Sequence, residues 1–109
     1  MTEMRLYLAQ RISAAIMAPL VLLHLGVMIY AIQGGLSAEE ILGRTRDSLF
    51  WAGSYGLFVL AASIHAAIGV RNILREWLGW QRQALFLAAL FGLLLLLLGG
   101  RAVAALVGW

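Results

Sequence analysis

Residues 51–77, WAGSYGLFVLAASIHAAIGVRNILREW, form an apolar run of helical length with one histidine, His65, in its interior. A run of this length and composition is typical of a helix that spans a membrane. An ionisable imidazole is costly in a hydrocarbon environment and needs a partner there. The stretch therefore predicts a membrane span and a binding partner for His65.

The composition of the whole chain also indicates a membrane protein. Of its 109 residues 63% are hydrophobic, and the mean hydropathy is +0.93, which is more apolar than a soluble domain of this size. Every one of its eight cations is an arginine. These arginines lie at the ends of apolar runs, where they meet lipid headgroups, and this placement argues against nucleic-acid binding. The lack of cysteine excludes disulfides, thiolate metal sites and cysteine nucleophiles.

We expect a single all-α membrane-anchor domain over residues 1–109, with three transmembrane helices in an up-down-up arrangement. The expected spans are residues 12–33, 49–73 and 83–107. The first run is longer than the core of a signal peptide, and at about 1.5 Å per residue it covers the roughly 30 Å hydrocarbon layer. Pro19 is expected to kink it. Ser37 and Glu40 have the spacing of a capping box, which predicts a short interfacial helix ending near Gly43.

The distribution of arginine predicts the orientation of the chain. Five arginines belong to the N-terminal segment and the second turn, and three to the first loop and the C-terminus: Arg5, Arg11, Arg71, Arg75 and Arg82 against Arg44, Arg46 and Arg101. Loops on the cytoplasmic side carry the excess of positive charge. We therefore expect a multi-pass protein of the inner (cytoplasmic) membrane of a bacterium, with the N-terminus inside.

Two histidines, His24 and His65, lie within apolar spans. Each can bond merely to a neighbouring helix or a water, but imidazole is also a standard axial ligand of haem iron. His24 lies about 20 Å along the helix from Arg11, whereas His65 lies about 9 to 15 Å from Arg71 and Arg75. The imidazoles are therefore expected at different depths, each facing a histidine of another chain. His65 is the stronger ligand candidate, and His24 binds a second, outer haem or is structural.

Polar residues gather at the inner ends of the first two spans: Arg11, Ser13, Arg71, Glu76 and Trp77. Snorkelling arginines, an interfacial tryptophan and a solvated ion pair account for them without any ligand. A quinone needs the same mixture, because an apolar cleft receives its tail while polar groups hold and protonate its carbonyl oxygens. Haem propionates likewise need arginine or serine nearby.

Two motifs resemble the cytochrome b membrane-anchor subunits of succinate dehydrogenase and fumarate reductase, respiratory complex II. Residues 10–25, QRISAAIMAPLVLLHL, are similar to the R-x-[ST] start of that family's first helix. Residues 65–77, HAAIGVRNILREW, are similar to its second-helix pattern H-x-x-x-G-[IV]-R-[HN]-x-x-x-[DE]-aromatic. The size and the three-span layout agree with the same family, which has two anchor types, and the motifs resemble both.

The resemblance implies roles for the residues of both motifs. His65 is the implied axial ligand of haem b, and Arg11 takes the place of an arginine near a haem propionate or the quinone. Ser13 matches the small hydroxyl residue of the first motif. Glu76 and Trp77 match the acid and the aromatic residue beside the quinone pocket, where many members have a tyrosine that Trp77 replaces with an indole donor.

The implied function is that of an electron-transfer subunit, without catalytic activity of its own, in an oxidoreductase complex of the tricarboxylic acid cycle. Its implied partners are an iron-sulfur subunit, a flavoprotein subunit and a second anchor chain, different or a second copy. One or two haem b groups are the implied cofactors, and quinone is the substrate. Two alternatives stay open: a haem-free structural anchor in which His65 makes only helix contacts, and a small transporter or assembly factor without a redox role.

Overall fold

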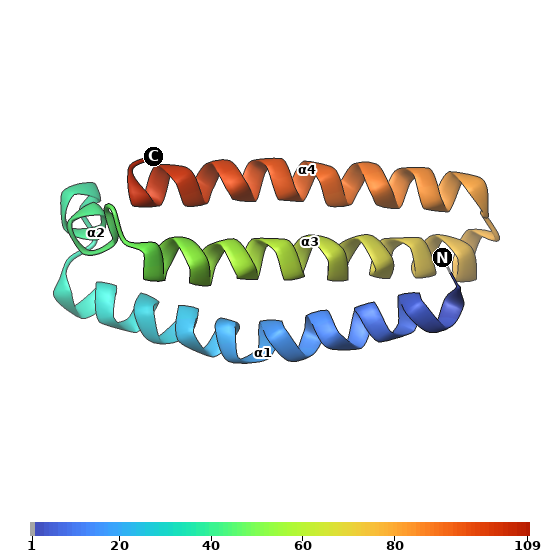
Figure 1. Ribbon diagram of the computed structural model, residues 1–109, viewed down its shortest axis with the longest axis horizontal. Coiled ribbons are helices and arrows are strands. Elements are labelled where there is room, and N and C mark those ends of the chain that lie inside the picture. The colour runs from blue at the N-terminus through green and yellow to red at the C-terminus, as the bar shows by residue number, and fades with distance from the viewer. Residues whose placement is uncertain (1) are drawn as a thin grey trace.

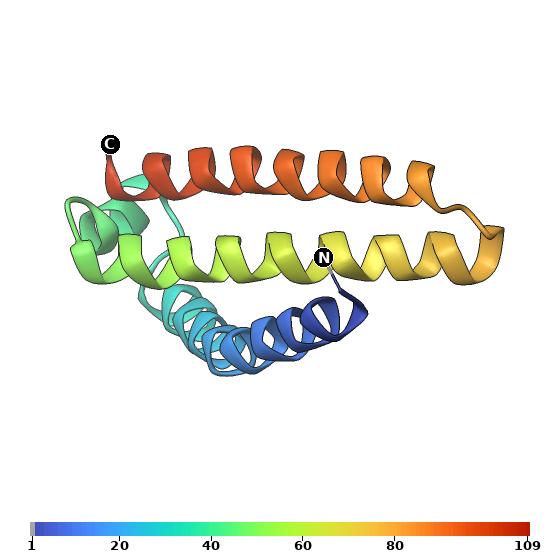
Figure 2. The ribbon, with the colours of Figure 1, turned by 45° about the vertical axis from the view of Figure 1, so that its right-hand side comes forward.

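The computed structural model describes residues 2–109 and consists of helices and their connections. The helices are α1 (Glu3–Gly34), α2 (Ala38–Thr45), α3 (Leu49–Leu78) and α4 (Arg82–Val107). Helix α3 lies between α1 and α4, and the three long helices alternate in direction (Figures 1 and 2). All three are long and apolar enough to cross a membrane. The predicted all-α fold with three spans in an up-down-up arrangement is confirmed.

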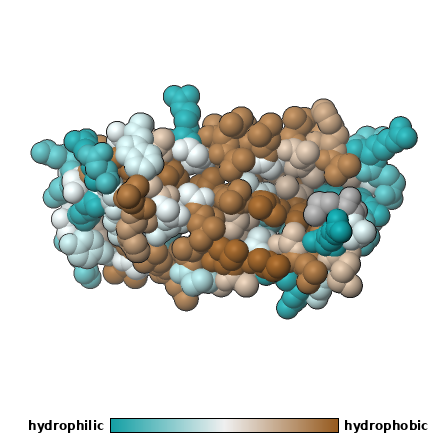
Figure 3. Space-filling model, in the orientation of Figure 1, coloured by the Kyte–Doolittle hydropathy of each residue, from teal (hydrophilic) through white to brown (hydrophobic). Residues whose placement is uncertain are grey.

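The bundle has the dimensions and surface of a bilayer-spanning unit. Its principal extents are 48 × 23 × 22 Å, and the long one is close to the roughly 40–45 Å thickness of a bilayer with its headgroups. An apolar belt separates polar groups at the two ends (Figure 3). Large apolar side chains such as Leu22 and Leu97 are exposed on the isolated chain, because lipid or partner helices replace a soluble core as their environment.

The long helices extend beyond the predicted spans. Helix α1 begins at Glu3, where the Thr2 hydroxyl accepts a hydrogen bond from the Arg5 N–H. Helix α3 continues to Leu78 and ends at Gly79, whose φ of 67° lies in the left-handed region that glycine tolerates. The predicted spans are matched to the hydrocarbon layer alone, and a helix can continue past that layer because its backbone hydrogen bonds are internal.

Pro19 lies near the middle of α1, and the helix stays continuous across it. Helix α1 bends there, while α3 and α4 are nearly straight (Figures 1 and 2). The proline ring removes one backbone donor and presses against the preceding turn, which is the usual cause of such a bend. The predicted kink therefore takes the form of a curved helix.

Helix α2 has the predicted capping box, in which the Ser37 hydroxyl accepts from the Glu40 N–H while the Glu40 carboxylate accepts from Ser37. These bonds to Ser37 hold the pKa of the Glu40 carboxyl below its ordinary value. The helix ends at Thr45, two residues later than Gly43, because the buried Thr45 hydroxyl donates to the Leu106 carbonyl at 2.6 Å. Asp47 N–H donates to Val107 O at 2.8 Å, so α2 is anchored to the end of α4.

Small residues let α3 and α4 approach closely. On α4 they follow one another at intervals of four, four and seven residues, which places them on one face of the helix. The face of α4 turned toward α3 carries Ala84, Ala88, Gly92 and Gly99. A Cβ atom at Gly92 would lie 2.8 Å from Ala67 Cβ and 3.4 Å from the Ser63 carbonyl oxygen. Close helix contact in a membrane depends on such small residues. These glycines therefore determine which face of the leucine-rich helix α4 packs against α3.

We predict that Gly92→Ala destabilises the protein by about 1–3 kcal/mol relative to Gly100→Ala, because a methyl group at position 92 forces two packed helices apart. Gly100 lies in the same helix with no atom near its added Cβ, so it controls for the gain in helix propensity. Unfolding of the detergent-solubilised protein measures the difference. Equal stability of the two variants would show that α3 and α4 are not in close contact at Gly92.

Candidate functional site

His65 projects from α3 toward the first half of α1. Its Nδ1 lies 3.2 Å from the Ser13 hydroxyl oxygen and 3.2 Å from the Gln10 carbonyl oxygen. Ser13 is buried, with 4% of its surface exposed, and His65 is half-buried. The helix of the second motif therefore places its histidine directly against the hydroxyl of the first motif, a pairing of residues that are 52 positions apart.

The hydrogen-bond partners of His65 favour one tautomer of its neutral imidazole. The Ser13 hydroxyl donates to the Gln10 carbonyl at 2.9 Å, so its oxygen is left as an acceptor toward the imidazole. A carbonyl oxygen only accepts, so Nδ1 carries the proton and donates. In that neutral tautomer Nε2 holds a free lone pair, and within residues 2–109 no hydrogen bond reaches it. An imidazole whose Nδ1–H is held by a backbone carbonyl has the arrangement of a metal-binding histidine, so the donor set fits a haem iron.

A polar hollow of about 540 Å³ lies at the same end of the bundle as the N-terminus. Helices α1 and α3 and the turn before α4 line it, with Glu3, Leu6, Tyr7, Gln10, Asn72, Arg75, Glu76 and Gln81. The Glu3 carboxylate accepts from Arg71 Nη2 at 2.6 Å and from Arg75 Nη1 at 2.8 Å. These ion pairs connect the start of α1 to the end of α3 and close one side of the hollow.

Gln10 lines this hollow, and one buried atom of its side chain is unsatisfied. Its Oε1 is buried and has no hydrogen-bond partner within residues 2–109. Such an atom costs about 1–3 kcal/mol if it stays unpaired, so it indicates a ligand or a water that completes the site. An amide offers both a donor and an acceptor and therefore suits either redox form of a quinone.

The structure separates the residues that the sequence grouped at this end. Glu76 lines the polar hollow and Arg71 is paired beside it, whereas Ser13 lies deeper, against His65. Arg11 is exposed, with its guanidinium 5.7 Å from the centre of the Tyr7 ring. Trp77 is 79% exposed and does not line the hollow.

Three site residues of α1 were missed by the sequence analysis: Glu3, Tyr7 and Gln10, which all line the polar hollow. The expected span begins only at residue 12, so these three residues lie outside it. The signal was present, because the spacing of four and three residues places all three side chains on one face of a helix.

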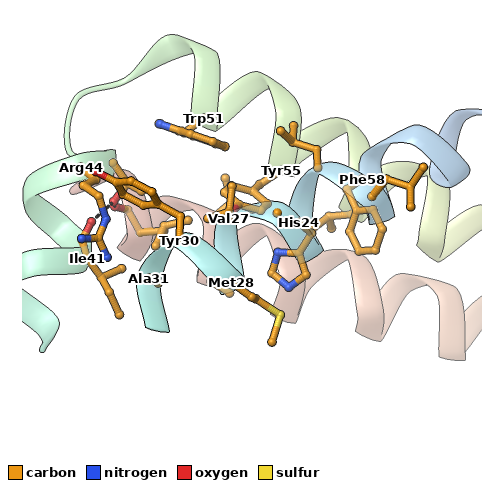
Figure 4. A pocket seen from close by; sticks show the side chains of 18 of the residues that line it. His24, Val27, Met28, Tyr30, Ala31, Ile41, Arg44, Trp51, Tyr55 and Phe58 are labelled. Atoms are coloured by element: carbon orange, nitrogen blue, oxygen red, sulfur yellow. Dashed lines mark hydrogen bonds between the residues drawn. The ribbon is translucent and has the colours of Figure 1, made fainter. Parts of the chain in front are cut away.

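The second histidine, His24, lies among aromatic residues at the opposite half of the bundle. Its ring meets Tyr55 edge-on, with the ring centres 5.7 Å apart, and stacks near Phe58 at 6.4 Å. It lines an open cavity of about 870 Å³, to which residues of all four helices contribute (Figure 4). The walls are apolar except near Arg44, which donates to the Gly35 carbonyl and lies over the Tyr30 ring.

The two histidines occupy different levels of the bundle, as the sequence predicted. His24 packs against Phe58, and Phe58 lies seven residues before His65 in the same helix, about 10 Å along its axis. The two imidazoles of one chain therefore do not converge on a single iron. Among residues 2–109 there is also no group of three His, Cys, Asp or Glu side chains that could hold a metal ion, whereas a haem iron takes only one or two axial ligands from protein.

Comparison with known proteins assigns the chain to a family. Residues 1–100 match the family described as Succinate dehydrogenase/Fumarate reductase transmembrane subunit. Searches of curated proteins and of solved structures gave no significant match. The match includes both sequence motifs, helices α1 and α3, α4 up to residue 100, His24 and His65, and the residues of the polar hollow. The chain belongs to the family of transmembrane subunits of succinate dehydrogenase and fumarate reductase.

Proposed function

We propose that the chain is a cytochrome b subunit of its complex, binding haem b through His65 and contributing to a quinone site in the polar hollow. The observation that carries this proposal is the free Nε2 lone pair of His65 in a half-buried position of the middle helix. An axial ligand of haem iron needs such a lone pair, and a histidine with both ring nitrogens hydrogen-bonded could not supply it. The unsatisfied Gln10 amide in the adjoining hollow gives independent support for a ligand.

In this proposal Nε2 of His65 would hold the haem iron, and the second anchor chain would supply any further ligand. Haem b supplies one-electron redox chemistry between the iron-sulfur partner and the quinone. The exposed guanidinium of Arg11, two residues from Ser13, is the candidate partner of a propionate. Ala66 and Gly69 near His65 are small enough for a flat macrocycle to approach, whereas Ala67 packs against Gly92 of α4.

His24 is proposed as the ligand of an outer haem if the complex holds two. The support is its position on the wall of the 870 Å³ apolar cavity, at a level distinct from that of His65. The cavity wall also carries the Tyr55 and Tyr30 hydroxyls and the Arg44 guanidinium. Where the complex holds one haem, the aromatic contacts of His24 give it a structural role in packing α1 against α3.

The polar hollow is proposed to hold the quinone headgroup. Gln10 offers its amide to a carbonyl or hydroxyl of the ring, and the Glu76 carboxylate is placed to exchange protons with bulk water at the membrane surface. Arg71 and Arg75 keep Glu3 ionised and fixed, so the hollow retains its shape. Trp77, exposed outside the hollow, remains a predicted neighbour that a partner subunit brings into contact.

The N-terminal end of the bundle is proposed to face the cytoplasm. Its five arginines exceed the three at the other end, and it contains the polar hollow and its ion pairs. The iron-sulfur and flavoprotein subunits then dock at this end, close to the quinone, and the dicarboxylate chemistry takes place on the flavoprotein. This arrangement describes a subunit of the inner membrane of a bacterium that has no catalytic activity alone.

A haem-free structural anchor is the second candidate, because the contacts of His65 Nδ1 with α1 by themselves give it a packing role. We expect the purified complex to show a b-type Soret band that His65→Ala removes while the subunits stay assembled. Optical spectra and the ratio of haem to polypeptide measure this. A wild-type complex without a haem Soret band would establish the structural anchor instead, whereas an unchanged band in the variant would show that His65 does not bind the haem.

Replacing Gln10 with leucine is expected to raise the KM for quinone about fivefold or more, since about 1 kcal/mol of hydrogen bonding to the headgroup is lost. Steady-state kinetics with a soluble quinone analogue measure the change. Gln33→Leu is the matched control, because Gln33 lies in the same helix, is exposed and lines neither cavity. A KM for quinone that is the same in both variants would show that Gln10 is not part of the quinone site.

The orientation has a direct test, because the chain contains no cysteine. Single cysteines are introduced as Trp80→Cys in the turn before α4 and as Gly43→Cys in α2, both at exposed positions. A membrane-impermeant maleimide is expected to label position 43 in intact spheroplasts and position 80 only in inverted vesicles. The reverse pattern would place the N-terminus and the polar hollow on the outer side.

A further inference from the structure

We infer that Ser13, acting together with the Gln10 carbonyl, is a positioning residue that orients His65 and sets the reduction potential of the haem it binds. This inference rests on the proposed function, in which Nε2 of His65 ligates the iron. It places Ser13 beside the haem ligand His65, whereas the sequence predicts a position near the quinone or a haem propionate. The contact of Ser13 with Nδ1 carries it.

Ser13 contacts His65 in addition to making the hydrogen bond that a serine in a membrane helix ordinarily makes. Such hydroxyls usually donate to a carbonyl of the preceding turn, and Ser13 does so at Gln10. Ser63 makes the same kind of bond, to Val59 at 2.7 Å, without contacting His65. Ser13 therefore satisfies its own donor and still presents a lone pair to the imidazole of another helix.

Two acceptors then share the Nδ1 proton of His65, and one of them, the Ser13 hydroxyl, is buried. Bonds to charged or polarised groups are stronger in such a low-dielectric environment. Donation from Nδ1–H to an oxygen fixes the ring orientation and raises the basicity of the ligating nitrogen. A more basic ligand stabilises ferric more than ferrous iron, so the Ser13 hydroxyl lowers the reduction potential of the haem.

The test uses the intact complex with Ser13→Ala, Ser13→Thr and the control Ser63→Ala, which removes an equally buried α3 hydroxyl. Ser13→Ala is expected to shift the midpoint potential upward in a redox titration. It is also expected to release haem about tenfold more readily to an apo-haem acceptor, at the lower end of losses seen for such supporting groups. Ser13→Thr, which keeps the hydroxyl, and Ser63→Ala are expected to match the wild type.

The possible outcomes separate this inference from the proposed function. If His65→Ala removes the haem but Ser13→Ala leaves both potential and haem release unchanged, the positioning role is wrong and the haem site stands. If His65→Ala retains the haem, the proposed function itself fails. If Ser13→Ala does not assemble, Ser13→Cys replaces it, and a potential equal to that of Ser13→Thr would overturn the role, since a thiol is the weaker acceptor.

Discussion

The lack of hydrogen-bond partners in a hydrocarbon layer is the constraint on which this structure depends. Polar groups within the three long helices have to be satisfied by the protein itself. Ser13 and Ser63 meet this requirement with a carbonyl of their own helix, and Thr45 does so across the gap to α4. Two atoms of the candidate site have no hydrogen-bond partner within residues 2–109: the buried Oε1 of Gln10 and Nε2 of His65. These two atoms are the ones left for a ligand.

Helix α3 is central because it carries contacts of two kinds on two faces. Toward α4 it meets small residues, and Gly92 and Gly99 allow backbone-level packing that no larger side chain permits. Toward α1 it makes polar contacts, with His65 in the interior and Arg71 and Arg75 paired to Glu3 at the end. The apolar face therefore determines how closely the helices pack, and the polar face defines the candidate site.

The two cavities divide the bundle into halves with different chemistry. The half that contains the N-terminus holds a polar hollow with an unsatisfied amide and ionisable groups, as a site that exchanges protons with water requires. The other half holds a larger apolar cavity beside His24, with Arg44 as its cation. His65 lies between the hollow and the middle of the membrane. Its backbone contact is with Gln10, whose side chain lines the hollow, so one residue of α1 connects the two parts of the candidate site.

The amino-acid sequence alone determined the helical class, the three spans and the capped helix α2, since hydropathy, length and the Ser37–Glu40 spacing are local properties. It also placed the two histidines at different depths, because rise per residue is fixed in a helix. Only the tertiary structure decided which face of the leucine-rich α4 meets α3, and that Ser13 contacts His65 rather than the inner hollow. Both depend on the rotation and the bend of one helix against another, which arise from packing between residues far apart in the chain.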